Sequence, residues 1–279
     1  MTFATRFAPS PTGPLHLGHA YSAILAHDMA RAAGGLFHLR IDDIDQSRAR
    51  REWDAQIRDD LAWLGLTWDS PVERQSTHFG SYRAAIDALA ARGLAYPCSC
   101  TRRDIEAAAS APQEGAPQFG PDGRIYPGTC RGRPMSGARD SDAIRLDLSR
   151  CTAPELAFTE TGPAHAGTHI VTLDALKRDV GDPVLARPNM AASYHLSIVL
   201  DDAAQGITHV VRGEDLFEAT WIQRLLQHLL DLPTPTYHHH ALIRDDTGKR
   251  LAKRDDARAI ARYRDEGATP ADIRRMVGL

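Results

Sequence analysis

Two histidines near the start of the chain are spaced so that both could contact a phosphate. His16 and His19 follow a loop rich in proline and glycine, residues 9–14, and stand where an apolar helical stretch begins. The start of a helix offers free backbone N–H groups and a dipole that favours anions. Imidazole N–H groups can donate to phosphate oxygens as charge builds up, and Gly18 lets a nucleotide lie close to the backbone. The pattern predicts an anion site for chemistry at phosphorus.

A second set of charges lies near the other end of the chain. Arg250 and Lys253 belong to the run Arg-Leu-Ala-Lys-Arg, which follows Asp-Asp-Thr-Gly-Lys. A loop that carries such charge could close on a triphosphate and stabilise a pentavalent phosphorus. A charge run by itself is usually a solvated surface. We favour a function for it because the histidine motif is also present.

Three cysteines could hold a metal ion. Cys98, Cys100 and Cys130 bracket a segment that is dense in Gly, Pro, Cys and Ser. In a cytosolic chain, clustered cysteines indicate metal binding or catalysis before disulfides. Three thiolates need one further donor to complete the four-coordinate site of structural zinc, and the conventional candidates are His165 and His169. The alternative is three reduced cysteines with an empty or partial site.

Two other groups of potential ligands are interpreted as structural. The run His238-His239-His240 has the residue type of a metal site. In a strand, however, neighbouring side chains face opposite ways and rarely share a metal. Cys151 fits no ligand spacing and is expected to be an inert thiol.

The elements that must position these residues alternate between strand and helix. We expect strands at residues 3–8, 36–41, 143–148, 169–173 and 207–212, and helices around 17–33, 53–64, 82–89 and 215–230. This alternation predicts an α/β fold with a parallel sheet. Residues 97–137 show little periodicity and predict an inserted, loop-rich module that something other than a large core must hold together.

Composition limits the class of protein. The chain has 279 residues, of which 43% are hydrophobic and 25% charged, and its net charge is -3. These values are typical of a globular protein with one large or two modest domains, and they argue against a broad basic surface for nucleic acid. The apolar stretches are too short for a membrane span, and no signal peptide is recognisable. We expect a cytoplasmic monomer.

The two motifs together resemble a known superfamily. The string that begins at Arg6, Arg-Phe-Ala-Pro-Ser-Pro-Thr-Gly-Pro-Leu-His-Leu-Gly-His, and the basic run near Lys253 are similar to the two signatures of class I aminoacyl-tRNA synthetases of the glutamate-specific lineage. The resemblance extends from about residue 5 to about residue 257, and it implies a Rossmann-type catalytic domain that uses ATP with Mg²⁺. In the basic run, Arg250 replaces the usual first lysine and Ala252 the usual serine.

The resemblance also implies a glutamate pocket. Arg6 and Ser10 match residues that hold the substrate, and Tyr194 matches a pocket tyrosine. Arg212 matches the arginine that pairs with the side-chain carboxylate, a task for which a planar guanidinium is suited. Asp42 stands where the family usually has a glutamate that binds the substrate ammonium, and it is one methylene shorter.

Two departures resemble a shorter paralogous family, the glutamyl-queuosine tRNA(Asp) synthetases. Only 25 residues follow Arg254, where a full glutamyl-tRNA synthetase has a large anticodon-binding domain, and Ile198 replaces an asparagine of the discriminating enzymes. This resemblance implies adenylation of glutamate and its transfer to the queuosine base of tRNA(Asp). It also implies that Tyr126 is the fourth ligand of one structural Zn²⁺, bound with the three cysteines.

The expected domain organisation follows from the same resemblance. Residues 1–96 and 189–245 would be the two halves of the Rossmann domain. Residues 97–188 would be the inserted, zinc-stapled module, similar to an acceptor-binding module. Residues 246–279 would carry the lysine loop and a short stem-contact segment, with no anticodon-binding domain.

Two other functions stay open at this stage. One is a fragment or minimal form of a tRNA-dependent glutamyl-tRNA synthetase. The other is a non-catalytic amino-acid or nucleotide sensor derived from a synthetase, which Asp42, Arg250 and Ala252 would favour. The retained His16 and Lys253 argue against a sensor, because a sensor has no need of groups that stabilise a transition state.

Overall fold

A parallel sheet near the N-terminus forms the first half of the scaffold. The computed structural model describes residues 2–109, 119–120, 123–243 and 258–279. Strands β1 (Ala4–Phe7), β2 (Leu36–Ile41) and β3 (Glu73–Arg74) pair in parallel in that order. Helices α1 (Leu17–Ala32) and α2 (Arg51–Trp63) connect them. The two strands and two helices expected in this region are confirmed, and each end lies within two residues of its expected position.

A second group of strands continues the sheet. Strands β11 (His209–Gly213), β12 (Thr236–His240) and β8 (Leu156–Glu160) are parallel, and β9 (Gly167–Val171) is antiparallel to β8. Just before β11, the N–H of Thr208 donates to the carbonyl of Ala4 at 3.0 Å, which places β11 beside β1. The parallel α/β prediction is confirmed, and β1 lies where the chain switches from one half of the sheet to the other.

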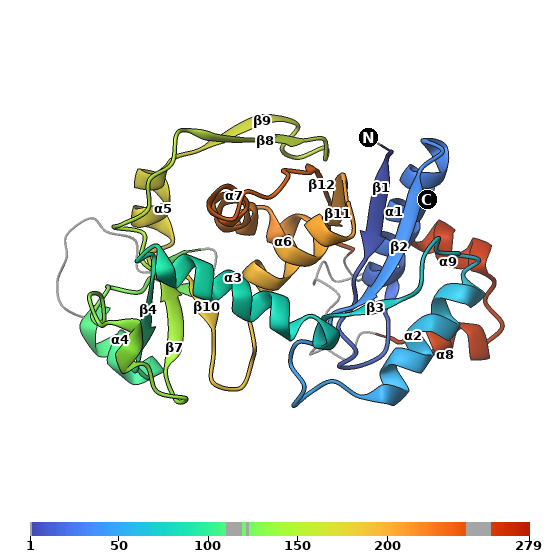
Figure 1. Cartoon of the computed structure of the whole chain (residues 1–279). Helices are drawn as coiled ribbons and strands as arrows, with labels where there is room; N and C mark the ends of the chain where they lie inside the picture. Colours follow the sequence, from blue (N-terminus) through green and yellow to red (C-terminus); the bar gives the residue numbers. More distant parts are fainter. Residues whose placement is uncertain (1, 110–118, 121–122, 244–257) are drawn as a thin grey trace.

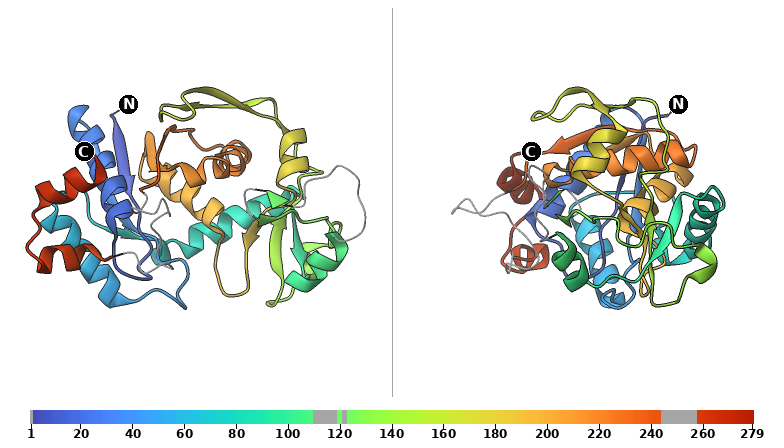
Figure 2. Two further views of the ribbon diagram at one scale, coloured as in Figure 1. Left: turned by 180° about the vertical axis from the view of Figure 1, so that it is seen from behind. Right: turned by 90° about the vertical axis from the view of Figure 1, so that its left-hand side faces the viewer.

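Helices cover the sheet in two groups, each with its own core (Figures 1 and 2). Helices α1, α2, α8 (Ile260–Asp265) and α9 (Pro270–Val277) enclose a core that includes Ile24 and Ile273. Helices α3 (Phe79–Ala91), α6 (Tyr194–Ala204) and α7 (Ala219–Leu229) enclose a larger one that includes Leu196 and Leu225. Within the described chain, no helix is long and apolar enough to cross a membrane.

One expected helix begins later than its apolar pattern indicated. We expected it to start at residue 215, but Glu214–Leu216 forms a short 3₁₀ turn, η3, and α7 starts only at Ala219. Similarly, the strand expected at 169–173 ends at Val171. There the hydroxyl of Thr172 accepts from the N–H of Ala175 at 3.2 Å and caps α5 (Leu173–Asp179). A side-chain cap of this kind ends the strand and starts the helix.

The inserted module is built on a small antiparallel sheet of β4 (Ala95–Cys98), β7 (Ala143–Leu146) and β10 (Val184–Ala186). It lies at the opposite end of the molecule from α2 and α9 (Figure 1). The module also contains four short elements: α4 (Arg102–Ala109), β5 (Phe119–Gly120), β6 (Gly123–Arg124) and η2 (Met135–Gly137). Another short element, η1 (Gln75–Thr77), precedes the module in the sequence. Helix α4 was not predicted, because it has too few apolar residues to show a helical stripe.

Candidate active site

A cavity of about 530 Å³ opens at the carboxyl ends of β1, β2 and β11. Ligands of open α/β sheets bind at this edge, where the strand order reverses. All the residues predicted to bind glutamate or nucleotide line the cavity, as far as the structure describes them. These are Arg6, Ser10, His16, Gly18, His19, Asp42, Tyr194 and Arg212. They come from both halves of the sheet, so the strand order brings them together.

The two histidines form the start of helix α1. His16 is the N-cap, and its Nδ1 accepts from the N–H of Gly18 at 3.1 Å, while Nδ1 of His19 accepts from the N–H of His16 at 3.2 Å. Their ring centroids lie 3.8 Å apart, and the ring planes are inclined by 34°. Because Nδ1 accepts in both rings, a neutral ring carries its proton on Nε2, and Nε2–H is the donor that each can offer to an anion.

A steric contact, which the sequence did not reveal, explains why position 18 is a glycine. A Cβ at this position would lie 3.1 Å from Cε1 and 3.2 Å from Nδ1 of His16. Such contacts are tight, so a side chain would push the His16 ring out of its capping position. The glycine therefore protects the histidine geometry, in addition to leaving room for a ligand.

Arg250 and Lys253 lie outside the described residues, but the residues on either side of their segment are described. Before it, Leu242 and Ile243 line the cavity. After it, Ala259 forms a β-bridge with His16, and the N–H of Ile260 donates to the carbonyl of Leu15 at 2.8 Å. The described residues before and after this segment therefore lie at the cavity or beside His16.

A buried ionic network supports the Arg6 and Asp42 side of the cavity. Asp202, on α6, accepts from Nε of Arg6 at 3.1 Å and from Nη1 of Arg40 at 2.8 Å. Arg40 also donates from Nε to Asp42 at 2.8 Å. Arg40 is fully buried, so these contacts occur in a medium that strengthens them. One chain of charges therefore fixes both pocket residues.

Sequence reasoning missed Arg40 and Asp202. The signal for Arg40 was its place two residues before Asp42, because alternate residues of a strand share a face. Asp202 follows Tyr194 by two helical turns on α6, and only the packing of α6 against the sheet brings it to Arg40.

Burial and neighbouring charges set different pKa values for the two acidic groups. Burial raises the pKa of Asp42 to about 6, although Arg40 opposes this increase. Burial would raise the pKa of Asp202 as well, but Arg6 and Arg40 outweigh it and hold that pKa below its usual value. Asp202 is therefore a fixed anion near neutral pH, whereas Asp42 titrates close to physiological pH.

Arg212 is held on the other side of the cavity by neutral groups. Its Nε donates to Nε2 of His239 at 2.9 Å, and its Nη2 donates to the hydroxyl of Thr220 at 2.8 Å and to the carbonyl of Leu216 at 3.2 Å. Nη1 is buried and has no hydrogen-bond partner among the described atoms. A buried donor without a partner is costly, so a ligand that accepts from Nη1 would gain from this arrangement.

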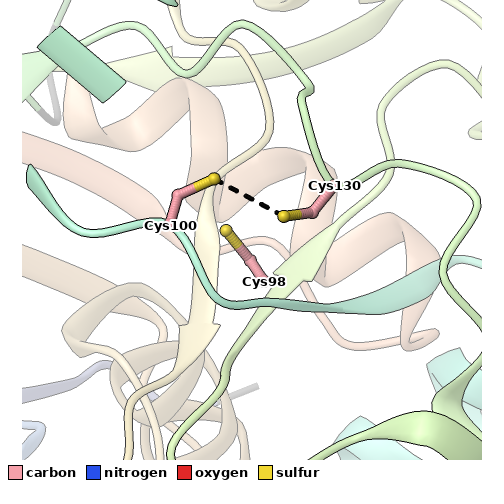
Figure 3. A group of neighbouring side chains, drawn as sticks. All are labelled: Cys98, Cys100 and Cys130. Carbon is pink, nitrogen blue, oxygen red and sulfur yellow. Dashed lines mark hydrogen bonds between the residues drawn. The ribbon is translucent and has the colours of Figure 1, made fainter. Parts of the chain in front are cut away.

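The three predicted cysteines converge in the inserted module (Figure 3). The sulfur atoms of Cys98, Cys100 and Cys130 all lie within 4.8 Å of one another. The hydroxyl of Tyr126 lies 3.3 Å from the sulfur of Cys98 and 3.4 Å from that of Cys100. The histidine at position 169 points elsewhere, because its Nε2 contacts the carbonyl of His165 at 2.6 Å. This group of cysteines could hold a metal ion, and the phenol oxygen of Tyr126 lies within contact distance of two of the sulfurs.

Comparisons with known proteins identify the class. The family model described as tRNA synthetases class I (E and Q), catalytic domain, matches residues 2–122 and 170–279. A glutamyl-Q tRNA(Asp) synthetase from Rhodobacter capsulatus is 66% identical over 278 residues, which cover 99% of each chain. A glutamyl-Q tRNA(Asp) synthetase from Geobacter sulfurreducens is 40% identical over 93% of this chain and 78% of its own.

A solved structure agrees with these matches. A glutamate tRNA ligase from Elizabethkingia meningosepticum, in complex with its amino acid, superposes with a TM-score of 0.77 at 25% identity. The match covers 100% of this chain and spans 61% of that ligase. The fold and the site define the catalytic domain of a class I aminoacyl-tRNA synthetase. Within that class, the chain belongs to the glutamyl-Q tRNA(Asp) synthetase family.

Proposed function

We propose that this protein activates glutamate with ATP and transfers it to the queuosine base of tRNA(Asp). The observation that carries the proposal is the 66% identity, over 99% of both chains, to a relative that bears this activity in its name. The cavity supports it, because those residues expected for glutamate and for ATP that the structure describes line one connected space.

Glutamate would lie between the two sides of the cavity. Asp42 would pair with the substrate ammonium, and Arg212 would receive the side-chain carboxylate through Nη1, the nitrogen that has no protein partner among the described atoms. Arg6, Ser10 and Tyr194 would complete the pocket. A neutral amide could not satisfy the charge of Arg212, so glutamine would be rejected.

The reaction needs no covalent nucleophile from the protein. The substrate α-carboxylate attacks the α-phosphorus of ATP, the bond to pyrophosphate breaks, and glutamyl-adenylate forms. His16 and His19 would donate from Nε2 to the phosphate oxygens, and Gly18 would keep their geometry. Arg250 and Lys253 would add positive charge, with Mg²⁺ bound to the triphosphate. Catalysis is then positioning and electrostatic stabilisation.

The cysteine group would hold one structural Zn²⁺, with Cys98, Cys100, Cys130 and Tyr126 as its ligands. Three converging sulfurs and one oxygen provide the four donors that a closed zinc site requires. The core around them is small, so the ion would supply folding free energy to the module. Metal analysis of the purified protein tests this proposal. We expect about one zinc per chain and less than half of that in a Cys130→Ser variant.

The expected domain boundaries remain part of the proposal. Residues 1–96 and 189–245 would form the catalytic domain, 97–188 the inserted module and 246–279 the lysine loop with a stem contact. Strand β4 crosses the first boundary, because it begins at Ala95 and ends at Cys98. Strands β8 and β9 lie within 97–188 in the sequence, but β8 pairs with β12 of the main sheet. tRNA(Asp) would contact the inserted module, and the protein would act as a monomer.

The test is ATP–pyrophosphate exchange without tRNA, followed by transfer of labelled glutamate to tRNA. We expect exchange with glutamate but not with glutamine or aspartate, and label only in tRNA(Asp) that carries queuosine. Charging of tRNA(Glu) would instead identify a minimal glutamyl-tRNA synthetase. Glutamate binding with no exchange, with or without tRNA, would identify a sensor.

A further inference from the structure

Three adjacent strands each place one polar side chain in a single row behind the glutamate cavity. Arg212 of β11 is paired with His239 of β12. Glu160 of β8 is paired with Tyr237, two residues before His239, and its carboxylate contacts the His239 ring. His239 and Glu160 are almost completely buried, at 1% and 2% exposed. The expectation that the three consecutive histidines are merely structural does not account for this row, because His239 contacts a residue of the predicted pocket.

The direction of each hydrogen bond in the row follows from its chemistry. The guanidinium of Arg212 can only donate, so Nε2 of His239, 2.9 Å away, must accept. The proton of a neutral His239 is therefore on Nδ1, which donates to Oε2 of Glu160 at 2.5 Å. Burial lowers the pKa of His239, which keeps the ring neutral and its Nε2 lone pair available near neutral pH.

Glu160 is itself locked in place. Its Oε1 accepts from the backbone N–H of Gly162 at 2.5 Å and from that of His239 at 2.9 Å. A Cβ on Gly162 would lie 2.0 Å from the carbonyl oxygen of His239, so only glycine permits this approach. Burial alone would raise the pKa of Glu160, but the hydrogen bonds from His239 and Gly162 lower it to about 2. The carboxylate is therefore charged throughout the physiological range.

We infer that Glu160 and His239 are positioning residues that set the orientation of Arg212 toward the side-chain carboxylate of the substrate. Glu160 fixes the tautomer of His239, and His239 holds Nε of Arg212. Thr220 holds Nη2 from the other side. Nη1 has no hydrogen-bond partner among the described atoms, and Arg212 lines the cavity. This inference rests on the proposed function, because it requires that Arg212 meets a carboxylate in the cavity.

The row suggests an isosteric substitution that leaves every atom in place and reverses one hydrogen bond. In Glu160→Gln, the amide oxygen would stay with the two backbone donors, so the amide NH₂ would face His239. His239 would then have to accept at Nδ1 and carry its proton on Nε2, against the N–H of Arg212. Arg212 would lose its acceptor, although packing would be unchanged.

The experiment measures KM for glutamate, KM for ATP and kcat in ATP–pyrophosphate exchange, with calorimetric binding of glutamate beside it. For Glu160→Gln and for His239→Phe we expect KM for glutamate to rise by roughly 10- to 100-fold, the size of a lost hydrogen bond to a charged group, while KM for ATP stays within about twofold. His239→Gln supplies an acceptor again, and we expect it to recover to within about fivefold of the wild type.

The matched control is His238→Phe. His238 is the neighbour on β12, and it contacts the hydroxyl of Thr161 at 3.0 Å instead of the cavity. We expect its kinetics to match the wild type. Unchanged KM for glutamate in both Glu160→Gln and His239→Phe, or an equal rise of both KM values in every variant, would overturn the positioning role. If Glu160→Gln does not fold, the contrast between His239→Phe and His239→Gln decides.

Glutamate binding and exchange activity of the wild-type protein distinguish a failure of this inference from a failure of the proposed function. A wild type that neither binds glutamate nor supports exchange removes the proposed function, and the inference falls with it. An active wild type with insensitive variants removes only the positioning role of Glu160 and His239.

Discussion

Asp42 and Arg212, on the two sides of the cavity proposed for glutamate, have opposite kinds of hydrogen-bond partners. At Asp42, charged groups neutralise one another: Arg40 bonds Asp42, and Asp202 bonds both Arg40 and Arg6. At Arg212, the bonded groups are an imidazole, a hydroxyl and a backbone carbonyl, which leave the positive charge of the guanidinium undiminished. From this difference we expect selectivity for glutamate to arise at Arg212 and not at Asp42. In the proposed binding mode, the ammonium of any amino acid would meet a carboxylate that already bonds Arg40, whereas the side-chain carboxylate would meet a guanidinium that bonds only neutral groups among the described residues.

The largest effect is expected for Arg212→Gln, which removes the cation proposed to bind the side-chain carboxylate. Removing one partner of a buried charge pair costs about 2–5 kcal/mol, which corresponds to a loss of roughly 30- to 5000-fold. We expect kcat/KM for glutamate-dependent exchange to fall by that factor, with KM for ATP within about twofold. Arg224→Gln is the control, because Arg224 on α7 donates to the carbonyl of Ala157 and is not among the residues that line the cavity in the described part of the chain. Wild-type kinetics in Arg212→Gln would show that residues other than Arg212 bind the glutamate side chain.

The second is Asp202→Asn, which removes the charge that joins Arg6 to Arg40. Leaving two buried guanidinium groups without their shared anion is expected to lower the free energy of unfolding by about 3 kcal/mol and to raise KM for glutamate. Urea denaturation measures the first effect and exchange kinetics the second. Asp69→Asn is the control, because its ion pair with Arg31 is about one-third exposed on both sides and contributes less than about 1 kcal/mol. Equal losses in the two variants would contradict the argument from burial.

The third concerns pH. Because the pKa of Asp42 is raised to about 6, the carboxylate becomes protonated as the pH falls through that value. Only the ionised form can pair with the substrate ammonium, so KM for glutamate should rise below pH 6, by at most about tenfold per pH unit. Asp42→Asn should have a higher KM that no longer changes in this range. If the slope persists in Asp42→Asn, another group is responsible for it.

The smallest effect is expected for Asp42→Glu, which restores the residue usual in glutamyl-tRNA synthetases. The extra methylene brings the carboxylate closer to the ammonium but must fit beside the fully buried Arg40. Overpacking of a buried site costs about 1 kcal/mol, and we expect KM for glutamate to stay within about threefold of the wild type. Thermal denaturation and exchange kinetics check both values. A loss as large as that of Asp42→Asn would mean that this site accepts only the shorter side chain.

Much of the fold could be predicted from local patterns. The first strand, the first two helices and the second strand lie where the spacing of apolar residues places them. The helices bury one side, whereas the two strands are buried along nearly their whole length. Helix α6 was not predicted as a helix, although it carries Tyr194 and Asp202. Helix α4 was missed because it packs little apolar surface, and surface helices without a stripe leave no periodic signal.

The residues that could do chemistry were determined by the sequence itself. The two histidines, the three cysteines, Arg6, Asp42 and Arg212 could be named from residue type, short spacing and resemblance, because a ligand requires particular side chains at particular places in a motif. The cysteines are also close in sequence, so they needed little tertiary structure to meet.

What holds those residues was decided only by the tertiary structure. Arg6 and Asp202 are 196 positions apart, and Glu160 and His239 are 79 apart. No spacing rule links such pairs, since strand order and helix packing bring them together. Burial then determines how they behave: it raises the pKa of Asp42 and lowers that of His239, and the buried Nη1 of Arg212 has no hydrogen-bond partner among the described atoms. The sequence shows which residues are charged. How strongly these charges interact depends on how far folding removes water from around them.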